Sequence, residues 1–309
     1  MTLTGKIHKY ILLALTLILV ASSAEAAELR LLRFGPAGEE RPGLLDAEGR
    51  IRDLSGHIDD ITPELLSDDG LDSIAAIELD DLPVVTGNPR LGVPLTGINK
   101  IMAVGFNYVN HAEEMAVELP TEPLIFSKAI SSLSGPFDDV IQPRGGFKLD
   151  YESELVIVIG RRTQYVDEAD VFDYIAGYTV GHDVSERSFQ RERGGQFVKG
   201  KSADTFGPVG PYLVTRDLVK DVQNLAVWSK INGEMRQQGN TTDMVFGVAQ
   251  IVSHLSQFMT LHPGDLIFTG TPAGVGDGMA PPQYLKPGDI VRIGVGDLGE
   301  QRQTIVAPE

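Results

Sequence analysis

Short strand-like segments separated by turn residues recur along this chain and constrain its fold more than any other feature. After residue 96 the strongest candidates, rich in Val, Ile and Leu, are residues 101–105, 155–159, 178–180, 212–214, 226–231, 266–269 and 290–295. The clearest helical pattern is residues 244–258, where apolar side chains recur every three to four positions. Because strands outnumber helices and do not alternate regularly with them, the pattern predicts a β-rich α+β fold rather than a doubly wound sheet.

The chain divides into a leader, a small front module and a long main module. Strand-like residues 29–34, 42–45 and 51–54 alternate with turns and predict a small antiparallel meander. Pro and Gly residues, among them Pro83, Pro89, Gly92, Pro94 and Gly97, then interrupt the chain, and we place the module boundary near residue 96. The predicted divisions are a signal peptide at 1–26, a small N-terminal module at 27–96 and a main module at 97–309.

Residues 1–26 have the pattern of a secretory signal peptide. Lys6 and Lys9 precede an apolar run at residues 10–21, and Ala24 and Ala26 supply the small-residue cleavage pattern. The apolar run is about a dozen residues long, shorter than the roughly 20 that span a bilayer. We therefore expect cleavage near Ala26 and a periplasmic or secreted protein, with an uncleaved anchor or a buried helix as the alternative.

The composition excludes several classes of function. Lys and Arg total 26 against 43 Asp and Glu, and the formal net charge is −17 at pH 7. So acidic a chain is a poor candidate for nucleic-acid binding, because the phosphate backbone would repel it. The chain has no cysteine, which excludes disulfides, zinc–thiolate sites and thiol nucleophiles.

Residues Gly195 to Ser202 match the spacing of a phosphate-binding loop, but their context argues against that function. Such a loop needs a buried strand before it and a helix after it, because the helix N-terminus supplies part of the anion site. Here residues 185–193 are rich in charge, and Gly207 and Pro208 interrupt the segment that follows. We expect no nucleotide at this loop, which leaves the role of Lys201 open.

Two carboxylates lie two residues apart where a predicted strand begins. Glu152 and Glu154 would project from the same face, and such close like charges repel unless a cation lies between them. A third oxygen could come from Asp183, although the residues alone do not favour it over Asp204 or Asp265. An all-oxygen set without histidine favours magnesium or manganese over zinc. Ordinary surface acids at the end of a strand are the alternative.

His111 and Glu114 lie three residues apart and form a second candidate pair. If the segment is helical, the carboxylate shares a face with the imidazole and can orient and charge-stabilise it. That arrangement suits a general base that draws a proton from water. A surface His–Glu pair without a catalytic role is the alternative.

Five separated motifs together resemble the fumarylacetoacetate hydrolase superfamily, from about Lys100 to the end of the chain. They are Gly105-Phe106-Asn107-Tyr108 with His111 and Glu114, residues 150–155, residues 183–187 with Gln190, residues 200–208 and residues 263–276. Their forms are most similar to members named ureidoglycolate lyase or 2,4-dioxo-3-deoxy-sugar-acid hydrolase. The front module also resembles the front module of those members.

The resemblance implies a mixed β-roll catalytic domain that forms a homodimer and contains a defined site. It implies that Mg²⁺ or Mn²⁺, with Ca²⁺ also possible, is bound by Glu152, Glu154 and Asp183. The residues that it places around the substrate are Tyr108, Arg187, Gln190 and Thr271. It further implies a catalytic role for His111 with Glu114, and a place for Lys201 beside the developing negative charge.

The expected activity is metal-dependent hydrolysis of a carbon–carbon bond in a 2,4-dioxo acid of the acylpyruvate type. His111 would deprotonate the attacking water, and Lys201 would stabilise the pyruvate-type enolate that leaves. Decarboxylation or isomerisation of a 2-oxo diacid, or ureidoglycolate cleavage, could use the same site. An exported binding protein without turnover is a more remote alternative, since the two βα-repeat lobes of a solute receptor are not apparent in the sequence.

Overall fold

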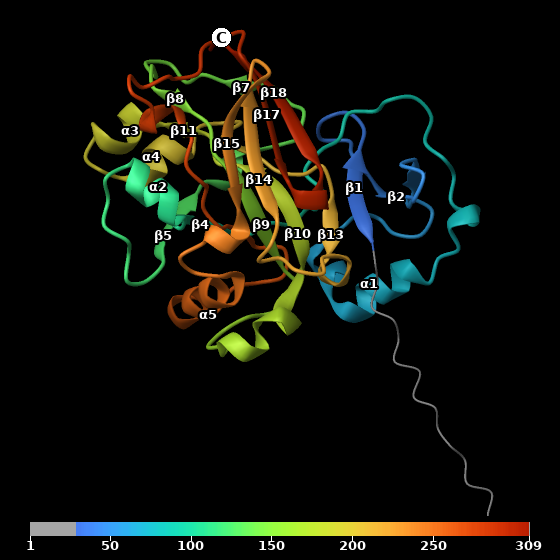
Figure 1. The fold of residues 1–309 in the computed structure, drawn as a ribbon. Helices are drawn as coiled ribbons and strands as arrows, with labels where there is room; N and C mark the ends of the chain where they lie inside the picture. The colour runs from blue at the N-terminus through green and yellow to red at the C-terminus, as the bar shows by residue number, and fades with distance from the viewer. Residues whose placement is uncertain (1–28, 309) are drawn as a thin grey trace, which may run out of the picture.

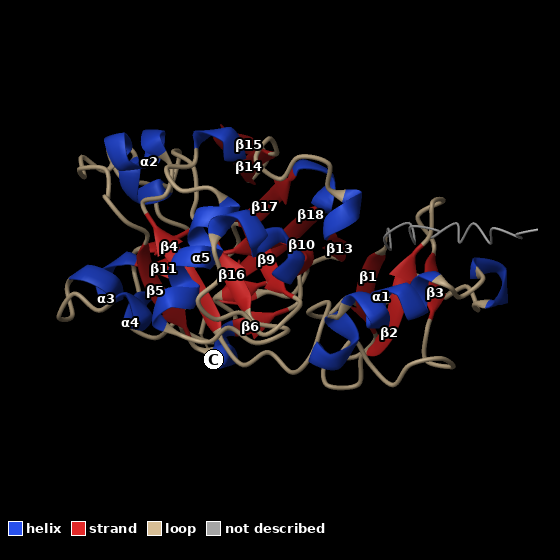
Figure 2. Cartoon of the chain, turned by 90° about the horizontal axis from the view of Figure 1, so that it is seen from below, coloured by secondary structure: helices blue, strands red, loops and turns tan. Residues whose placement is uncertain are grey.

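The computed structural model describes residues 29–308, so the predicted signal peptide lies outside the described residues. Two large sheets and a few short helices make up most of the described chain, which confirms the predicted β-rich α+β class (Figures 1 and 2). Between residues 29 and 308, no helix combines the length and the apolar character needed to cross a membrane.

The larger sheet has nine strands in the order β3-β2-β1-β13-β10-β9-β16-β4-β5. Its strands are β1 Arg30–Phe34, β2 Arg41–Leu45, β3 Ile51–Asp53, β4 Ile101–Gly105, β5 Leu124–Lys128, β9 Ser153–Ile159, β10 Ile175–His182, β13 Leu213–Thr215 and β16 Leu266–Phe268. The central strands β9 and β10 are buried along their whole length, so both of their faces are covered. That burial explains the continuous apolar run from Leu155 to Ile159.

The smaller sheet has five strands in the order β15-β14-β17-β18-β7 and packs on the larger one. Its strands are β7 Val140–Ile141, β14 Ala226–Ile231, β15 Glu234–Asn240, β17 Ile290–Val295 and β18 Glu300–Val306. Buried and exposed side chains alternate along β18, as expected for a strand with one face on the core. Two minor sheets pair the short strands β8 Leu149–Asp150 with β11 Ser185–Glu186 and β6 Leu133–Ser134 with β12 Gly207–Pro208.

The predicted N-terminal meander is present as β1 to β3, and it extends the large sheet. β1 pairs with β13 through Arg30 opposite Val214 and Leu31 opposite Leu213. The apolar side chains of the meander share one core cluster with residues of β9 and β16. Main-chain hydrogen bonds therefore join the two predicted modules, and the boundary near residue 96 stays a prediction.

The helices are short: α1 Asp68–Ala75, α2 Val109–Glu114, α3 Arg187–Arg191, α4 Phe197–Lys201 and α5 Val248–Phe258. The helix predicted at 244–258 is therefore present but begins four residues later. The main-chain amides of Val245 and Phe246 donate to the carbonyl and side-chain oxygens of Asn107 at 2.7 and 2.9 Å. These bonds hold residues 244–247 outside the helix, although their apolar pattern continues that of α5.

Candidate active site

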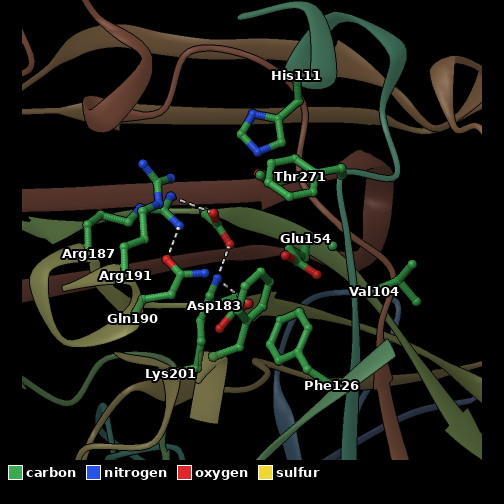
Figure 3. A pocket seen from close by; sticks show the side chains of 14 residues that line it. Val104, His111, Phe126, Glu154, Asp183, Arg187, Gln190, Arg191, Lys201 and Thr271 are labelled. Atoms are coloured by element: carbon green, nitrogen blue, oxygen red, sulfur yellow. Dashed lines mark hydrogen bonds and ion pairs between the residues drawn. The ribbon is translucent and has the colours of Figure 1, made fainter. Parts of the chain in front are cut away.

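Eight of the ten predicted site residues line one pocket between α2 and the α3–α4 segment (Figure 3). They are His111, Glu152, Glu154, Asp183, Arg187, Gln190, Lys201 and Thr271. Six further residues complete the wall, the charged Arg191 and the largely apolar set Val104, Gly105, Phe106, Phe126 and Phe197. The pocket therefore combines a charged inner end with an aromatic side.

The register of β9 against β10 brings the three predicted metal ligands together. Glu154 lies opposite Gly181, and the amide of Asp183 donates to the carbonyl of Glu152 at 3.0 Å. One carboxylate oxygen from each of Glu152, Glu154 and Asp183 lies within 4.8 Å of the others, and all three residues are buried. The sequence alternatives lie elsewhere: Asp204 is exposed, and Asp265 pairs with Lys100.

The charges of the three carboxylates are unequally compensated. Burial, with the charges of Asp183 and Glu152, raises the pKa of Glu154 well above its ordinary value. Burial opposes ionisation of Glu152 as well, but Lys201 and Arg187 hold its pKa below the usual range. Among the described residues, Glu154 accepts one hydrogen bond, from the amide of Gly270 at 2.7 Å. This crowded all-oxygen set fits a hard divalent cation.

Two lysines contact Asp183 from different elements. Nζ of Lys201, at the end of α4, donates to Glu152 Oε2 at 2.6 Å and to Asp183 Oδ2 at 2.7 Å. Nζ of Lys128, at the end of β5, donates to Asp183 Oδ1 at 2.5 Å and to the carbonyl of Lys201 at 2.6 Å. Lys128 is fully buried and was not predicted. Its only sequence signal is a lysine that closely follows the apolar residues Leu124, Ile125 and Phe126.

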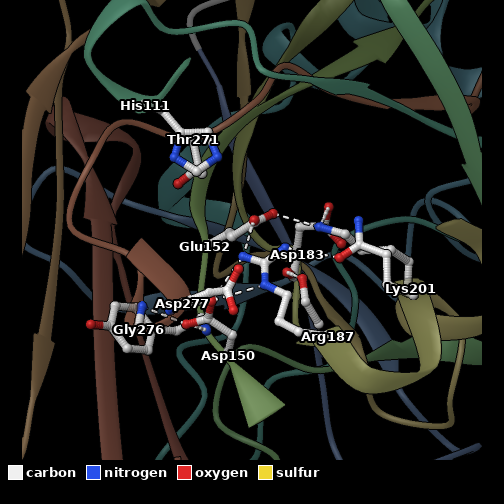
Figure 4. A network of polar contacts seen from close by, with 12 residues as sticks. His111, Asp150, Glu152, Asp183, Arg187, Lys201, Thr271, Gly276 and Asp277 are labelled. Carbon is white, nitrogen blue, oxygen red and sulfur yellow. Dashed lines mark hydrogen bonds and ion pairs between the residues drawn. The ribbon is translucent and has the colours of Figure 1, made fainter. Parts of the chain in front are cut away.

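Arg187 is fixed by acids on two sides (Figure 4). Its Nη2 donates to Glu152 Oε1 at 2.6 Å, and its Nε donates to Asp150 Oδ2 at 2.9 Å. Its Nη1 donates to Gln190 Oε1 at 3.2 Å, which orients that amide at the pocket wall. Asp150 also accepts the amide of Gly276 at 2.7 Å, so the buried Asp150 ties the arginine to the loop after β16. Asp150 was part of a motif but was not predicted as a site residue.

The predicted helical pair is present on α2. Nδ1 of His111 lies 3.3 Å from Oε2 of Glu114, and the imidazole points into the pocket (Figure 3). Oε1 of Glu114 accepts the amide of Gly274 at 2.9 Å. The imidazole also stacks on the ring of Phe106 with 5.7 Å between centroids. The imidazole of His111 is thus positioned by the carboxylate of Glu114 at one edge and by the ring of Phe106 against one face.

A family model described as the C-terminal domain of fumarylacetoacetate (FAA) hydrolase matches residues 100–306. The chain belongs to the fumarylacetoacetate hydrolase family. The pocket lies within the matched region, so this family's enzymes are the proper comparison for its chemistry.

Other proteins resemble this fumarylacetoacetate hydrolase family member over nearly their whole lengths. A Burkholderia cenocepacia protein for which a hydrolase activity is proposed is 53% identical over 277 residues, covering 89% of this chain and 98% of the relative. The solved fumarylacetoacetate hydrolase of the psychrophile Exiguobacterium antarcticum superposes with a TM-score of 0.81 at 34% identity, covering 91% of this chain and 100% of that one. These matches show that the chain is an enzyme of this family with the family fold.

Two further solved structures represent different reactions. A maleylpyruvate hydrolase from Sphingobium sp. SYK-6 has a TM-score of 0.76 at 32% identity, covering 90% of this chain and 100% of its own. A 2-hydroxyhepta-2,4-diene-1,7-dioate isomerase from Mycobacterium marinum has a TM-score of 0.69 at 31% identity, covering 90% and 98%. The fold therefore does not by itself choose between hydrolysis and isomerisation.

Of two residues predicted to bind substrate, Thr271 lines the pocket of this family member and Tyr108 does not. Thr271 lines the pocket, where its hydroxyl donates to the carbonyl of Ser153 at 2.9 Å and accepts from Gln237 Nε2 at 2.7 Å. Tyr108 is fully buried, does not line the pocket, and has no hydrogen-bond partner for its hydroxyl among the described residues. Burial and the charge of Glu154 raise the pKa of that hydroxyl. A role for Tyr108 in substrate binding stays a prediction.

The segment that resembles a phosphate-binding loop contains a helix of its own. Within Gly195 to Ser202, residues Phe197–Lys201 form α4, and an exposed turn rather than a buried strand precedes it. The side chain of Lys201 points to Glu152 and Asp183. Lys201 therefore belongs to the pocket. The prediction that this segment binds no nucleotide remains a prediction.

Proposed function

We propose that this protein is a divalent-metal-dependent hydrolase that cleaves a carbon–carbon bond in a 2,4-dioxo acid of the acylpyruvate type. The observation that carries the proposal is one pocket lined by a buried carboxylate triad, by His111, which contacts Glu114, and by the cations Arg187 and Lys201. The likeness to a maleylpyruvate hydrolase adds support, because maleylpyruvate is itself an acylpyruvate.

Glu152, Glu154 and Asp183 would hold the ion, which we propose is Mg²⁺ or Mn²⁺, with Ca²⁺ as a further candidate. When bound, the ion supplies a Lewis acid and a template for the carboxylate and keto oxygens of a 2-oxo acid.

In this proposal His111 acts as the general base. Because Glu114 Oε2 occupies the Nδ1 side of the ring, the proton on the imidazole lies there and Nε2 is left to take a proton from water. The carboxylate then stabilises the imidazolium that forms. The hydrogen bond from the amide of Gly274 orients Glu114 for this role.

The remaining steps use the cations of the pocket. Water adds to the C4 carbonyl of the acylpyruvate, the C3–C4 bond breaks, and its electron pair passes to the pyruvate enolate. Lys201 and Arg187 lie at the inner end of the pocket, where this negative charge would develop. His111 returns the proton to C3, so the products are pyruvate and a carboxylic acid.

Isomerisation of a 2-oxo diacid is the second candidate, favoured by the likeness to the Mycobacterium marinum isomerase. That reaction shifts a proton and needs no attacking water, so it makes no use of a water-activating base. The two reactions therefore differ in whether oxygen from water enters the product.

The deciding experiment incubates the protein with a panel of acylpyruvates, oxaloacetate, an unsaturated 2-oxo diacid and ureidoglycolate in ¹⁸O-labelled water. We expect acylpyruvate cleavage that needs Mg²⁺ or Mn²⁺, stops with EDTA, and places one ¹⁸O atom in the released carboxylate. Turnover of the 2-oxo diacid without ¹⁸O uptake would favour the isomerase instead. Acylpyruvate cleavage that survives EDTA would remove the metal from the proposal.

Export and assembly are separate proposals. From the leader pattern we propose that the protein is periplasmic or secreted, with a mature chain that begins at Ala27. N-terminal sequencing of the exported protein tests this, and an intact Met1 in the cytoplasm would contradict it. We also propose a homodimer, which light scattering of the purified protein would reveal.

A further inference from the structure

Positive charge is concentrated on one side of the pocket mouth, although the chain as a whole is strongly acidic. Residues 144–148 and 187–201 together carry seven Lys or Arg and one acid, Glu192, whereas the whole chain has 26 basic and 43 acidic residues. Four of these cations are exposed, and we call them the basic flank: Arg144, Arg191, Arg193 and Lys199.

The basic flank is a single surface that adjoins the pocket. Arg191 at the end of α3 lines the pocket itself. Arg193 follows in the exposed turn between α3 and α4, where Nζ of Lys199 donates to its carbonyl at 2.7 Å. A Cβ added at Gly145 would lie 3.8 Å from Nη2 of Arg193, which places the loop of Arg144 beside this turn.

Nearby acids compensate part of this surface, and among the described residues its Arg193 and Lys199 form no ion pair with an acid. Glu192 is paired with Lys148 at 2.5 Å, and Asp277 is paired with Arg191 at 2.5 Å. The segment that contains α2 contributes Gly105, Phe106 and His111 to the pocket wall, and its residues 105–123 contain four Glu and no Lys or Arg. Cations are therefore concentrated in the α3–α4 segment and acids in the α2 segment, and Figure 2 shows these two segments apart from one another.

We propose that the basic flank captures the anionic substrate and guides it into the pocket along the α3–α4 side. This inference rests on the proposed function, since a 2-oxo acid carries at least one negative charge at neutral pH. A chain of net charge −17 repels such an anion at long range, and a local cationic surface reverses that field at the mouth. The Debye length is about 8 Å at physiological salt, so only cations close to the mouth can act in this way.

The test compares two charge-reversal variants with equal changes in net charge. The first is R193E/K199E, which alters the basic flank without touching a residue that lines the pocket. The control is K220E/K286E, which reverses two exposed lysines that do not line the pocket. If R193E/K199E does not fold, R193Q/K199Q gives the same comparison with half the charge change.

The first readout is kcat/KM for an acylpyruvate between about 20 and 500 mM NaCl. We expect R193E/K199E to lose about tenfold in kcat/KM at low salt and less than about twofold at high salt, with kcat unchanged. The control should follow the wild type. Equal salt dependence in wild type and R193E/K199E would overturn the proposal, and so would a loss of kcat.

The second readout does not need turnover. The probe is oxalate, a small dianion that shares the carboxylate–carbonyl unit of a 2-oxo acid, and its affinity is measured by isothermal titration. We expect the wild type to bind oxalate more tightly at low salt than at high salt. The affinity of R193E/K199E should depend less on the salt concentration. If no 2-oxo acid is turned over but this difference is found, the proposed function fails and the capture of anions stands. If oxalate binds equally to both proteins at every salt concentration, the inference fails.

Discussion

The ammonium of Lys128 lies 2.5 Å from Oδ1 of Asp183, and neither side chain is exposed by more than 1%. The same Nζ donates to the carbonyl of Lys201 at 2.6 Å. One buried cation therefore holds both a carboxylate of the triad and the end of α4. Burial lowers the pKa of Lys128, although the charge of Asp183 opposes that shift. Lys128 thus depends on its partners to remain charged in the core.

Lys128→Met should destabilise the fold strongly. Removing one partner of a buried ion pair leaves the other charge uncompensated, which costs about 3–5 kcal/mol. Urea unfolding of the metal-free protein measures this loss. Lys286→Met, at an exposed lysine, is the control and should change the free energy of unfolding by less than about 0.5 kcal/mol. Equal midpoints for K128M and the wild type would show that Lys128 does not anchor Asp183.

Glu154→Gln should separate two effects of the triad: the loss of stability caused by its crowded negative charges, and the gain in stability when it binds a metal ion. Without divalent ions, the variant should be at least as stable as the wild type, because it removes the carboxylate that burial and like charges disfavour. With Mg²⁺ at a hundred times its dissociation constant, the wild type should gain about 2.7 kcal/mol and the variant far less. Thermal unfolding with and without Mg²⁺ measures both effects.

Glu113→Gln is the matched control for the triad, since Glu113 is an exposed glutamate on α2. It should keep the full gain in stability on addition of Mg²⁺. If Glu154→Gln kept that gain too, the ion would have to bind away from Glu154.

The sequence was sufficient for most strands whose apolar side chains face the core, and it was insufficient for several others, including β5. Strands β4, β14 and β17 match the predicted residues 101–105, 226–231 and 290–295 at both ends, because their apolar side chains face the core. β15 was missed. It is an edge strand with a single buried residue, Gln237, so its sequence lacks the apolar pattern from which strands are recognised.

In the site, contacts between residues close in sequence could be predicted from their spacing, whereas contacts that depend on strand pairing could not. His111 and Glu114 could be paired from local spacing, because three residues on a helix bring two side chains to one face. Asp183 joins Glu152 through the pairing of β9 with β10, and that register is not visible in the spacing of the residues. Lys128 reaches the triad from a strand that was not predicted, and buried lysines are too rare to expect without a structure.

His111→Ala should lower kcat for acylpyruvate cleavage by about 10²–10⁴-fold, the range for loss of a general base. Binding of Mg²⁺ and of oxalate should change little, because the imidazole is not part of the carboxylate triad. His57→Ala, at an exposed histidine of the front module, is the control and should leave kcat unchanged. Wild-type turnover by H111A would exclude His111 as the base.

Asp46 should make the front module sensitive to acid. Oδ2 of Asp46 accepts from Nε of both Arg50 and Arg52 at 2.8 Å, and its Oδ1 accepts the amides of Glu48 and Arg50 at 3.1 and 2.8 Å. Desolvation opposes ionisation, but these bonds lower the pKa of Asp46 from 3.8 to about 2. The ionised carboxylate therefore stabilises the fold above pH 4, and that contribution is lost as the pH falls towards 2.

Asp46→Asn is the variant that tests this dependence. It should unfold at a lower urea concentration than the wild type at pH 7, and the difference should shrink as the pH is lowered from 5 to 2. The matched control is Asp80→Asn, at an exposed acid of the same module, which should behave as the wild type throughout. A difference between D46N and the wild type that stayed constant down to pH 2 would mean that the charge of Asp46 is not what stabilises this turn.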